Sequence, residues 1–186
     1  SWLADRLGDT IASPSFTLID DGRLPGALGT SPWDGEGVAT RRTVLVDRGM
    51  CAAFAWDGYH ARRRGVPSTG NAARGFSSRP GVGFHNLFVQ PGPEPVEALI
   101  RRVKRGLWFD HHGSFGYNAV SGDYSYQASG QWIEDGEFAF PVDGITVAGN
   151  SLEMLARIEA VASELEFRST VASPALLIGE MTIGGE

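Results

Sequence analysis

The residues with the most reactive side chains in this sequence form the run Asp110-His111-His112. Imidazole and carboxylate groups are common zinc ligands, and imidazole also serves as a general base. Neighbouring side chains on a strand point to opposite faces, so the two histidines can share one ion only if the run forms a loop. His111 and His112 are therefore candidates for a metal site. The alternative is that they are exposed or make ordinary hydrogen bonds and bind no metal.

No sequence motif of a known catalytic site accompanies these histidines. The chain contains no His-Glu-x-x-His, no Gly-x-Ser-x-Gly, no Cys-x-x-Cys pair and no complete Gly-x-Gly-x-x-Gly. Its single cysteine, Cys51, lies in an apolar run, which predicts a buried and unreactive thiol. We therefore expect no catalytic residue and no cofactor in this chain.

A second candidate site is the run Ser68-Thr69-Gly70-Asn71, which follows an arginine-rich segment. Its small residues offer hydroxyls and backbone N–H groups at close range, which suits a carboxylate or a peptide backbone. Together with Arg42, the run is predicted to bind a peptide or a partner. Gly70→Val should then weaken binding and leave stability nearly unchanged. A turn that only reverses the chain is the alternative.

Asp123 and Tyr124 form a third candidate, because an acid beside a phenol can bind a peptide or move a proton. The alternative is structural. An aspartate after a turn glycine commonly accepts a hydrogen bond from its own backbone.

These residues must be positioned by a strand-rich framework. The segment Val120–Asn150 predicts a meander, with a strand–turn–strand around Glu134-Asp135-Gly136-Glu137 and a short third strand at Gly144–Val147. Pro141 is predicted to end the second strand. Asp47-Arg48-Gly49-Met50 predicts another hairpin turn, again with glycine third.

Three helices are predicted, two of them amphipathic. A short one covers Asp57–Arg64, and the amphipathic pair covers Pro95–Arg105, ended by Gly106, and Asn150–Leu165. A last hairpin-like pair joins Ala175–Ile178 to Met181–Ile183. The sequence thus predicts an α+β fold with a large, mostly antiparallel sheet, in one domain covering residues 1–186.

Composition narrows the classes of protein further. The 186 residues are 42% hydrophobic, and no apolar run is long enough to span a membrane. One cysteine fits a reducing cytoplasm. The net charge of −6 is uneven, since residues 41–105 hold 12 Lys/Arg against 4 Asp/Glu. Such a stretch suits an acidic partner or a phosphate backbone, and cations paired within the chain are the alternative. The start at Ser1, without methionine, suggests a piece of a longer protein.

Several longer blocks resemble the TldD/PmbA family, whose members have been called modulators of DNA gyrase. The blocks occur in the family's order and cover almost the whole chain. They are Asp34-Gly35-Glu36-Gly37-Val38 with Thr40, Arg42 and Thr43; Tyr59-x-Ala61-Arg62 to Gly65; Ser68-Thr69-Gly70-Asn71-Ala72; Val120-Ser121-Gly122-Asp123-Tyr124-Ser125; Ala128-Ser129-Gly130-x-Trp132-Ile133-Glu134; and Ile145-x-Val147-Ala148-Gly149-Asn150. The resemblance is to the C-terminal half of the family protein.

The resemblance implies a two-subunit cytoplasmic protease that trims precursor peptides and degrades unfolded polypeptide. In the family, the TldD-type subunit holds zinc through His-Glu-x-x-x-His in its other half and a late cysteine. The PmbA-type subunit, also called TldE, lacks these ligands. Here the late segment Phe167–Pro174 contains no cysteine, which places the chain with the PmbA type.

The expected partners are accordingly a zinc-bearing TldD-like subunit and an unfolded or precursor peptide, with a homo-oligomer left open. Two other functions remain as alternatives. One is a gyrase- or nucleic-acid-associated binding domain, against which the acidic overall charge argues. The other is an autonomous hydrolase that uses His111 or His112.

Overall fold

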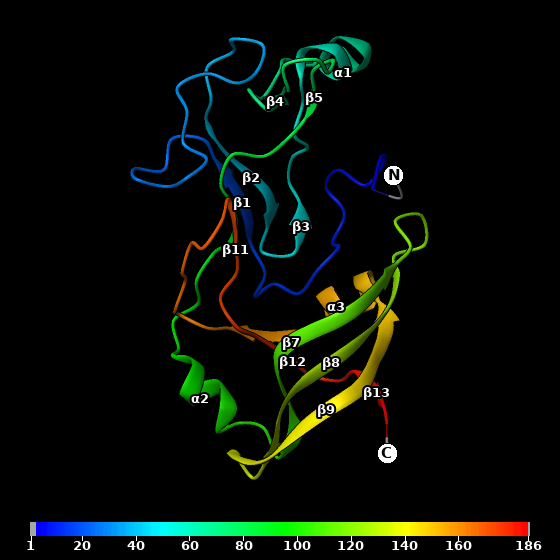
Figure 1. Cartoon of the computed structure of the whole chain (residues 1–186). Helices are drawn as coiled ribbons and strands as arrows, with labels where there is room; N and C mark the ends of the chain where they lie inside the picture. The colour runs from blue at the N-terminus through cyan, green and yellow to red at the C-terminus, as the bar shows by residue number, and fades with distance from the viewer. Residues whose placement is uncertain (1–2, 186) are drawn as a thin grey trace.

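Most strands of the chain belong to two β-sheets, one in the upper and one in the lower half of Figure 1, which shows a computed structural model. The structure describes residues 3–185, without the side chains of residues 110–115. Nearly all strand pairs are antiparallel, so the predicted α+β class with mostly antiparallel strands is confirmed. The strands divide, however, into more than one sheet.

The first sheet has the strand order β11-β6-β1-β2-β3. Its strands are β1 (Leu18–Asp21), β2 (Arg42–Asp47), β3 (Met50–Cys51), β6 (Leu87–Val89) and β11 (Val171–Ala172). Only β11 and β6 run parallel. The turn between β2 and β3 places Arg48 at φ 44° and Gly49 at φ 82°. The left-handed region is readily open to glycine, which explains why the predicted hairpin forms here.

The second sheet has the order β13-β9-β8-β7 and contains the longest strands. They are β7 (Arg105–Tyr117), β8 (Asp123–Glu134), β9 (Glu137–Asn150) and β13 (Thr182–Gly184). The predicted turn is confirmed, with Asp135 at φ 46° and Gly136 at φ 83°. Pro141 lies inside β9 rather than ending it. The pairing of β13 with β9 involves only residues 146–148, so Pro141 occupies an edge, where a missing N–H breaks no ladder.

The helices are shorter than the hydrophobic pattern predicts: α1 (Gly58–Arg64), α2 (Val96–Ile100) and α3 (Ser151–Ala156). The helix expected to reach Arg105 ends at Ile100. Beyond it, the Lys104 carbonyl accepts the Asp135 N–H (2.8 Å) and Arg105 pairs with Glu134 in the sheet. Gly106, expected as a cap, lies within β7. Residues 104–106 therefore pair with the tip of the β8–β9 hairpin instead of continuing the helix.

The helix predicted over residues 150–165 is wrong in its second half. Asn150 caps α3 as expected, because its side-chain oxygen accepts the Leu152 N–H (3.0 Å). After Ala156 the chain becomes β10 (Ile158–Val161), which pairs with β12 (Leu176–Ile178). Ile158 and Val161 are β-branched, which favours a strand, and both side chains are buried in the strand as they would have been in the predicted helix.

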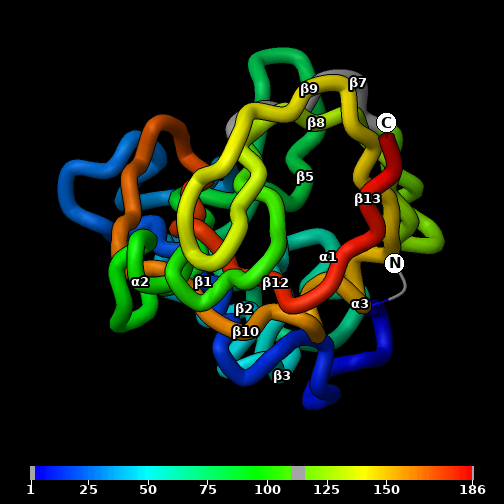
Figure 2. Tube along the Cα trace, turned by 90° about the horizontal axis from the view of Figure 1, so that it is seen from below, coloured from blue at the N-terminus to red at the C-terminus, as the bar shows by residue number. Residues whose placement is uncertain are grey.

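The predicted C-terminal hairpin is also wrong, because β12 pairs with β10 whereas β13 pairs with β9. Another small sheet joins β4 (Ala72–Ala73) to β5 (Gly81–Val82). The view in Figure 2 shows α3 and β10 near β3. There they build the first core with Phe16, Val46 and Cys51. A second core, around Tyr124 and Val147, covers the β8–β9 sheet.

Candidate functional site

The run Ser68-Thr69-Gly70-Asn71 lies between α1 and β4, at the top of Figure 1. Its first two residues bind the backbone just before α1. The Ser68 hydroxyl donates to the Trp56 carbonyl (3.1 Å), and the Thr69 hydroxyl accepts the Trp56 N–H (2.7 Å). Half of the run is therefore tied to the chain that precedes it.

Asn71 links this run to the first sheet through a buried polar network. Its side chain is 2% exposed and that of Asp20 is 0% exposed. The Asn71 amide donates to Asp20 Oδ2 (2.6 Å) and to the Gly83 carbonyl (3.0 Å), and its oxygen accepts from the Thr69 hydroxyl (2.7 Å). The other Asp20 oxygen accepts the His85 N–H (2.8 Å). The side chains of Thr69 and Asn71 therefore serve the fold.

Gly70 is fixed by its conformation and by its surroundings. Its φ is 75°, and a Cβ there would lie 2.5 Å from the Ala39 carbonyl oxygen. Its own carbonyl lies 2.8 Å from Nε2 of His85. The expectation that Gly70→Val would spare stability is therefore wrong, since a side chain must collide with backbone.

A second motif, the loop after Trp33, packs against the end of the same run. One oxygen of Asp34 accepts the N–H groups of Glu36 and Val38 (2.9 Å each), and the other accepts the Ala72 N–H (2.9 Å). The Gly35 N–H returns a bond to the Ala72 carbonyl (2.7 Å). Asp34 thus holds the loop in shape and docks it beside β4.

Two carboxylates bind the first N–H groups of helix α1, and one of them comes from the loop at residues 33–38. Asp57 caps it by accepting the His60 N–H (2.7 Å), and Glu36 accepts the Gly58 N–H (2.6 Å). Nδ1 of His60 also lies 2.8 Å from the Asp57 carboxylate. Burial of Asp57 favours its neutral form. This effect is outweighed by hydrogen bonds from the backbone and ring of His60, by the charge interaction with that ring, and by a hydrogen bond from the Tyr59 N–H. The pKa of Asp57 therefore lies below its usual value.

The loop at residues 33–38 therefore meets α1 and the segment after it at one end of the molecule. We call the surface formed by residues 33–38, α1 and residues 72–80 the basic end. Residues 58–80 contain five arginines and no acidic residue. The guanidinium of Arg63 lies 5.8 Å from the centre of the Tyr59 ring. Gly35, Arg74, Gly75 and Phe76 line a hollow of about 320 Å³.

Arg42, predicted to assist the run, is exposed at the start of β2, where its backbone pairs with Asp21. Its neighbour Arg41 makes the contact instead, donating from Nη2 to the Ser68 carbonyl (3.0 Å). The sequence shows only that the two arginines are neighbours, which does not indicate which of them contacts the run. Arg41 lies just before β2 begins, and the fold brings its side chain to the Ser68 carbonyl.

Asp123 and Tyr124 do not act as a pair. Asp123 accepts from the Asn150 amide (2.9 Å) and the Ser121 hydroxyl (2.7 Å), and these bonds lower the pKa of Asp123. Tyr124 is buried in the second core, and a Cβ on Gly149 would touch its hydroxyl. Both residues lie in the second sheet, whereas Ser68–Asn71 is anchored to the first, so the structure does not unite the predicted site residues.

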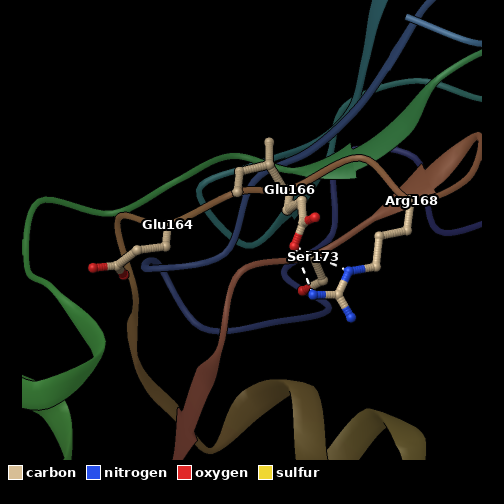
Figure 3. A pocket seen from close by; sticks show the side chains of 5 residues that line it. Glu164, Glu166, Arg168 and Ser173 are labelled. Carbon is tan, nitrogen blue, oxygen red and sulfur yellow. Dashed lines mark hydrogen bonds and ion pairs between the residues drawn. The ribbon is translucent and has the colours of Figure 1, made fainter.

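A second hollow, of about 480 Å³, is shown in Figure 3 and is lined by Glu164, Leu165, Glu166, Arg168 and Ser173. Arg168 pairs with Glu166 at 2.7 Å, and this bond and charge lower the pKa of Glu166. Glu164 accepts the Val96 N–H (3.1 Å) at the start of α2. Its charged groups mostly bind one another or the backbone, so this hollow offers little to an outside ligand.

Metal ligands can be assessed only where side chains are described. Within that part of the chain, no three His, Cys, Asp or Glu residues lie close enough to hold one ion. His111 and His112 fall outside it, so the idea of a metal site there stays a prediction. Among the described helices, none is long and apolar enough to cross a membrane.

The sequence model of the "PmbA/TldA metallopeptidase C-terminal domain" family matches residues 1–185. The chain therefore belongs to this family, as the motifs predicted. Two curated relatives come from Haemophilus influenzae. A "Metalloprotease PmbA homolog" is 34% identical over 100% of this chain and 39% of its own length. A "Metalloprotease TldD homolog" is 31% identical over 100% of this chain and 42% of its own length.

The fold agrees with solved structures of the family. TldE from Thermococcus kodakarensis superposes with a TM-score of 0.91 at 33% identity, over 98% of this chain and 42% of that one. The chain thus spans about two fifths of the length of its relatives. It is similar to relatives with either name, PmbA or TldD.

Proposed function

We propose that this chain is the C-terminal domain of a metal-free, PmbA/TldE-type subunit in a cytoplasmic peptidase. In this role it binds a TldD-like subunit that carries zinc, and it helps to hold an unfolded or precursor peptide. The chain itself supplies no zinc ligand and no catalytic group.

The proposal rests on one observation: the late segment Phe167–Pro174 lacks a cysteine in a chain that belongs to this family. Zinc in a hydrolase needs three protein ligands and an open position for water. This segment contains no cysteine. The single cysteine of the chain, Cys51, packs in the first core, where burial raises the pKa of its thiol. A buried neutral thiol is a poor metal ligand.

The test is to express the chain, with whatever else its gene encodes, alone and together with a relative that carries His-Glu-x-x-x-His. Metal content is measured after dialysis at neutral pH, and turnover is measured with unfolded casein. We expect no stoichiometric zinc and no turnover from the chain alone. The pair should co-purify, hold zinc and cleave casein in a manner that a chelator abolishes.

Three results would overturn the proposal. One is tightly bound zinc on the chain alone that His111→Ala removes and the control His60→Ala leaves in place. Another is chelator-resistant turnover by the chain alone, which would favour an autonomous hydrolase. The third is failure of the two proteins to co-purify under conditions in which each is folded.

A further inference from the structure

We propose that the basic end binds an acidic, extended polypeptide segment and seats one of its aromatic side chains in the hollow beside Phe76. This inference rests on the proposed function, because it names the class of peptide that the subunit would hold.

Two arginines, Arg74 and Arg62, lie close to Gly35 and Glu36. A Cβ on Gly35 would lie 3.0 Å from the Arg74 Cβ, and one on Gly58 would lie 2.8 Å from the Glu36 carboxylate and 3.1 Å from Arg62 Nη1. Among the ion pairs of the described residues, none involves Arg62 or Arg74. Guanidinium groups with free donors bind carboxylates in two-pronged fashion.

The acidic residues nearby already have partners in the backbone. Asp34 accepts three N–H groups, Asp57 caps α1, and Glu36 accepts the Gly58 N–H. They hold the loop and the helix in place. These three carboxylates keep their charge, but the five arginines within residues 58–80 outnumber them, and one of the five, Arg64, also pairs with Asp5 (3.8 Å). The surface is therefore net positive. A ligand that brings carboxylates complements it.

The hollow supplies an apolar contact beside these charges. Two of its four lining residues, Gly35 and Gly75, have no side chain, which leaves room against the ring of Phe76. Phe76 is fully exposed and Tyr59 is 54% exposed. Exposed aromatics next to arginine are typical of the residues that dominate binding energy at protein interfaces. An aromatic side chain of a bound peptide fits this setting.

A short peptide suits the charge distribution better than nucleic acid does. Outside residues 41–105 the chain carries 4 Lys/Arg against 18 Asp/Glu. A long polyanion reaching beyond the basic end would meet this negative remainder and be repelled. A short acidic segment meets only the positive surface.

Fluorescence anisotropy tests the proposal with a labelled synthetic peptide in which glutamates flank one phenylalanine. Arg74→Glu and Arg62→Gln should each weaken its binding about tenfold, about 1.4 kcal/mol. Glutamine is chosen at position 62 because the Glu36 carboxylate lies near. Arg23→Glu, a matched charge reversal at an exposed loop residue, should leave binding unchanged. All variants are first shown to keep the wild-type thermal midpoint.

The hollow is tested separately by replacing the peptide's phenylalanine with alanine. Wild type should prefer the phenylalanine peptide, and Phe76→Ser should lose that preference. Equal binding of a lysine peptide, equal weakening by Arg23→Glu, or tighter binding of a single-stranded oligonucleotide of the same charge would overturn the inference. The assay needs no zinc and no partner, so its failure is distinct from failure of the proposed subunit role.

Discussion

Replacing Asn71 with alanine should destabilise this chain strongly, because the buried side chain holds a polar network together. The side chain makes three hydrogen bonds inside the protein, to the Asp20 carboxylate, the Gly83 carbonyl and the Thr69 hydroxyl. A bond to a charged group contributes about 1.5–3 kcal/mol and a neutral one about 1 kcal/mol. Since Asp20 would stay buried with one oxygen unpartnered, we expect a loss of about 3–5 kcal/mol.

That loss is large beside the total stability of a typical domain, about 5–15 kcal/mol. In a chain of this size it corresponds to a fall in Tm of about 10 °C. Urea unfolding followed by tryptophan fluorescence gives the free energy of unfolding. Asn118→Ala is the matched control, because Asn118 is exposed and accepts the Val120 N–H in a surface turn. It should cost about 1 kcal/mol or less.

Asn71→Asp keeps the shape of the side chain but replaces the donor to Asp20 with a second carboxylate. It should cost at least as much as the alanine variant, because two buried like charges would face each other. An Asn71→Ala protein within about 1 kcal/mol of wild type, with an unchanged denaturant slope, would refute this account of the network. The run would then be a surface feature, as the sequence allowed.

Two further predictions concern neighbouring positions. Gly70→Ala should cost about 1–2 kcal/mol more than Gly37→Ala in urea unfolding, because both glycines have positive φ but only Gly70 faces the Ala39 carbonyl within 4 Å; equal costs would contradict the close contact. The lowered pKa of Asp57 in the folded state stabilises the fold fully above about pH 4 and stops doing so as pH falls through the folded pKa. The stability lost on His60→Ala should therefore shrink as the pH falls below about 4, and a loss that stays constant from about pH 4 to about pH 2 would contradict the pairing.

Local signals predicted two hairpin turns, the extent of α1 and the start of α3. Gly49 and Gly136 adopt the positive φ that their turns require, and Gly65 does the same after α1. These features depend on a few adjacent residues. The same local reasoning failed for residues 101–105 and 157–165, where strand partners from distant segments override the helical spacing of apolar residues.

For the candidate site, the sequence by itself determined the family and the residue types that gather at the basic end. It could not determine which way the Ser68–Asn71 run faces. Asn71 and Asp20 are 51 residues apart, and only folding places them 2.6 Å from each other. Tertiary structure also separates Asp123 and Tyr124 from that run and brings Arg41, rather than Arg42, to it. Burial and long-range hydrogen bonds decide these roles, because a polar side chain that loses water must find its partner wherever the fold provides one.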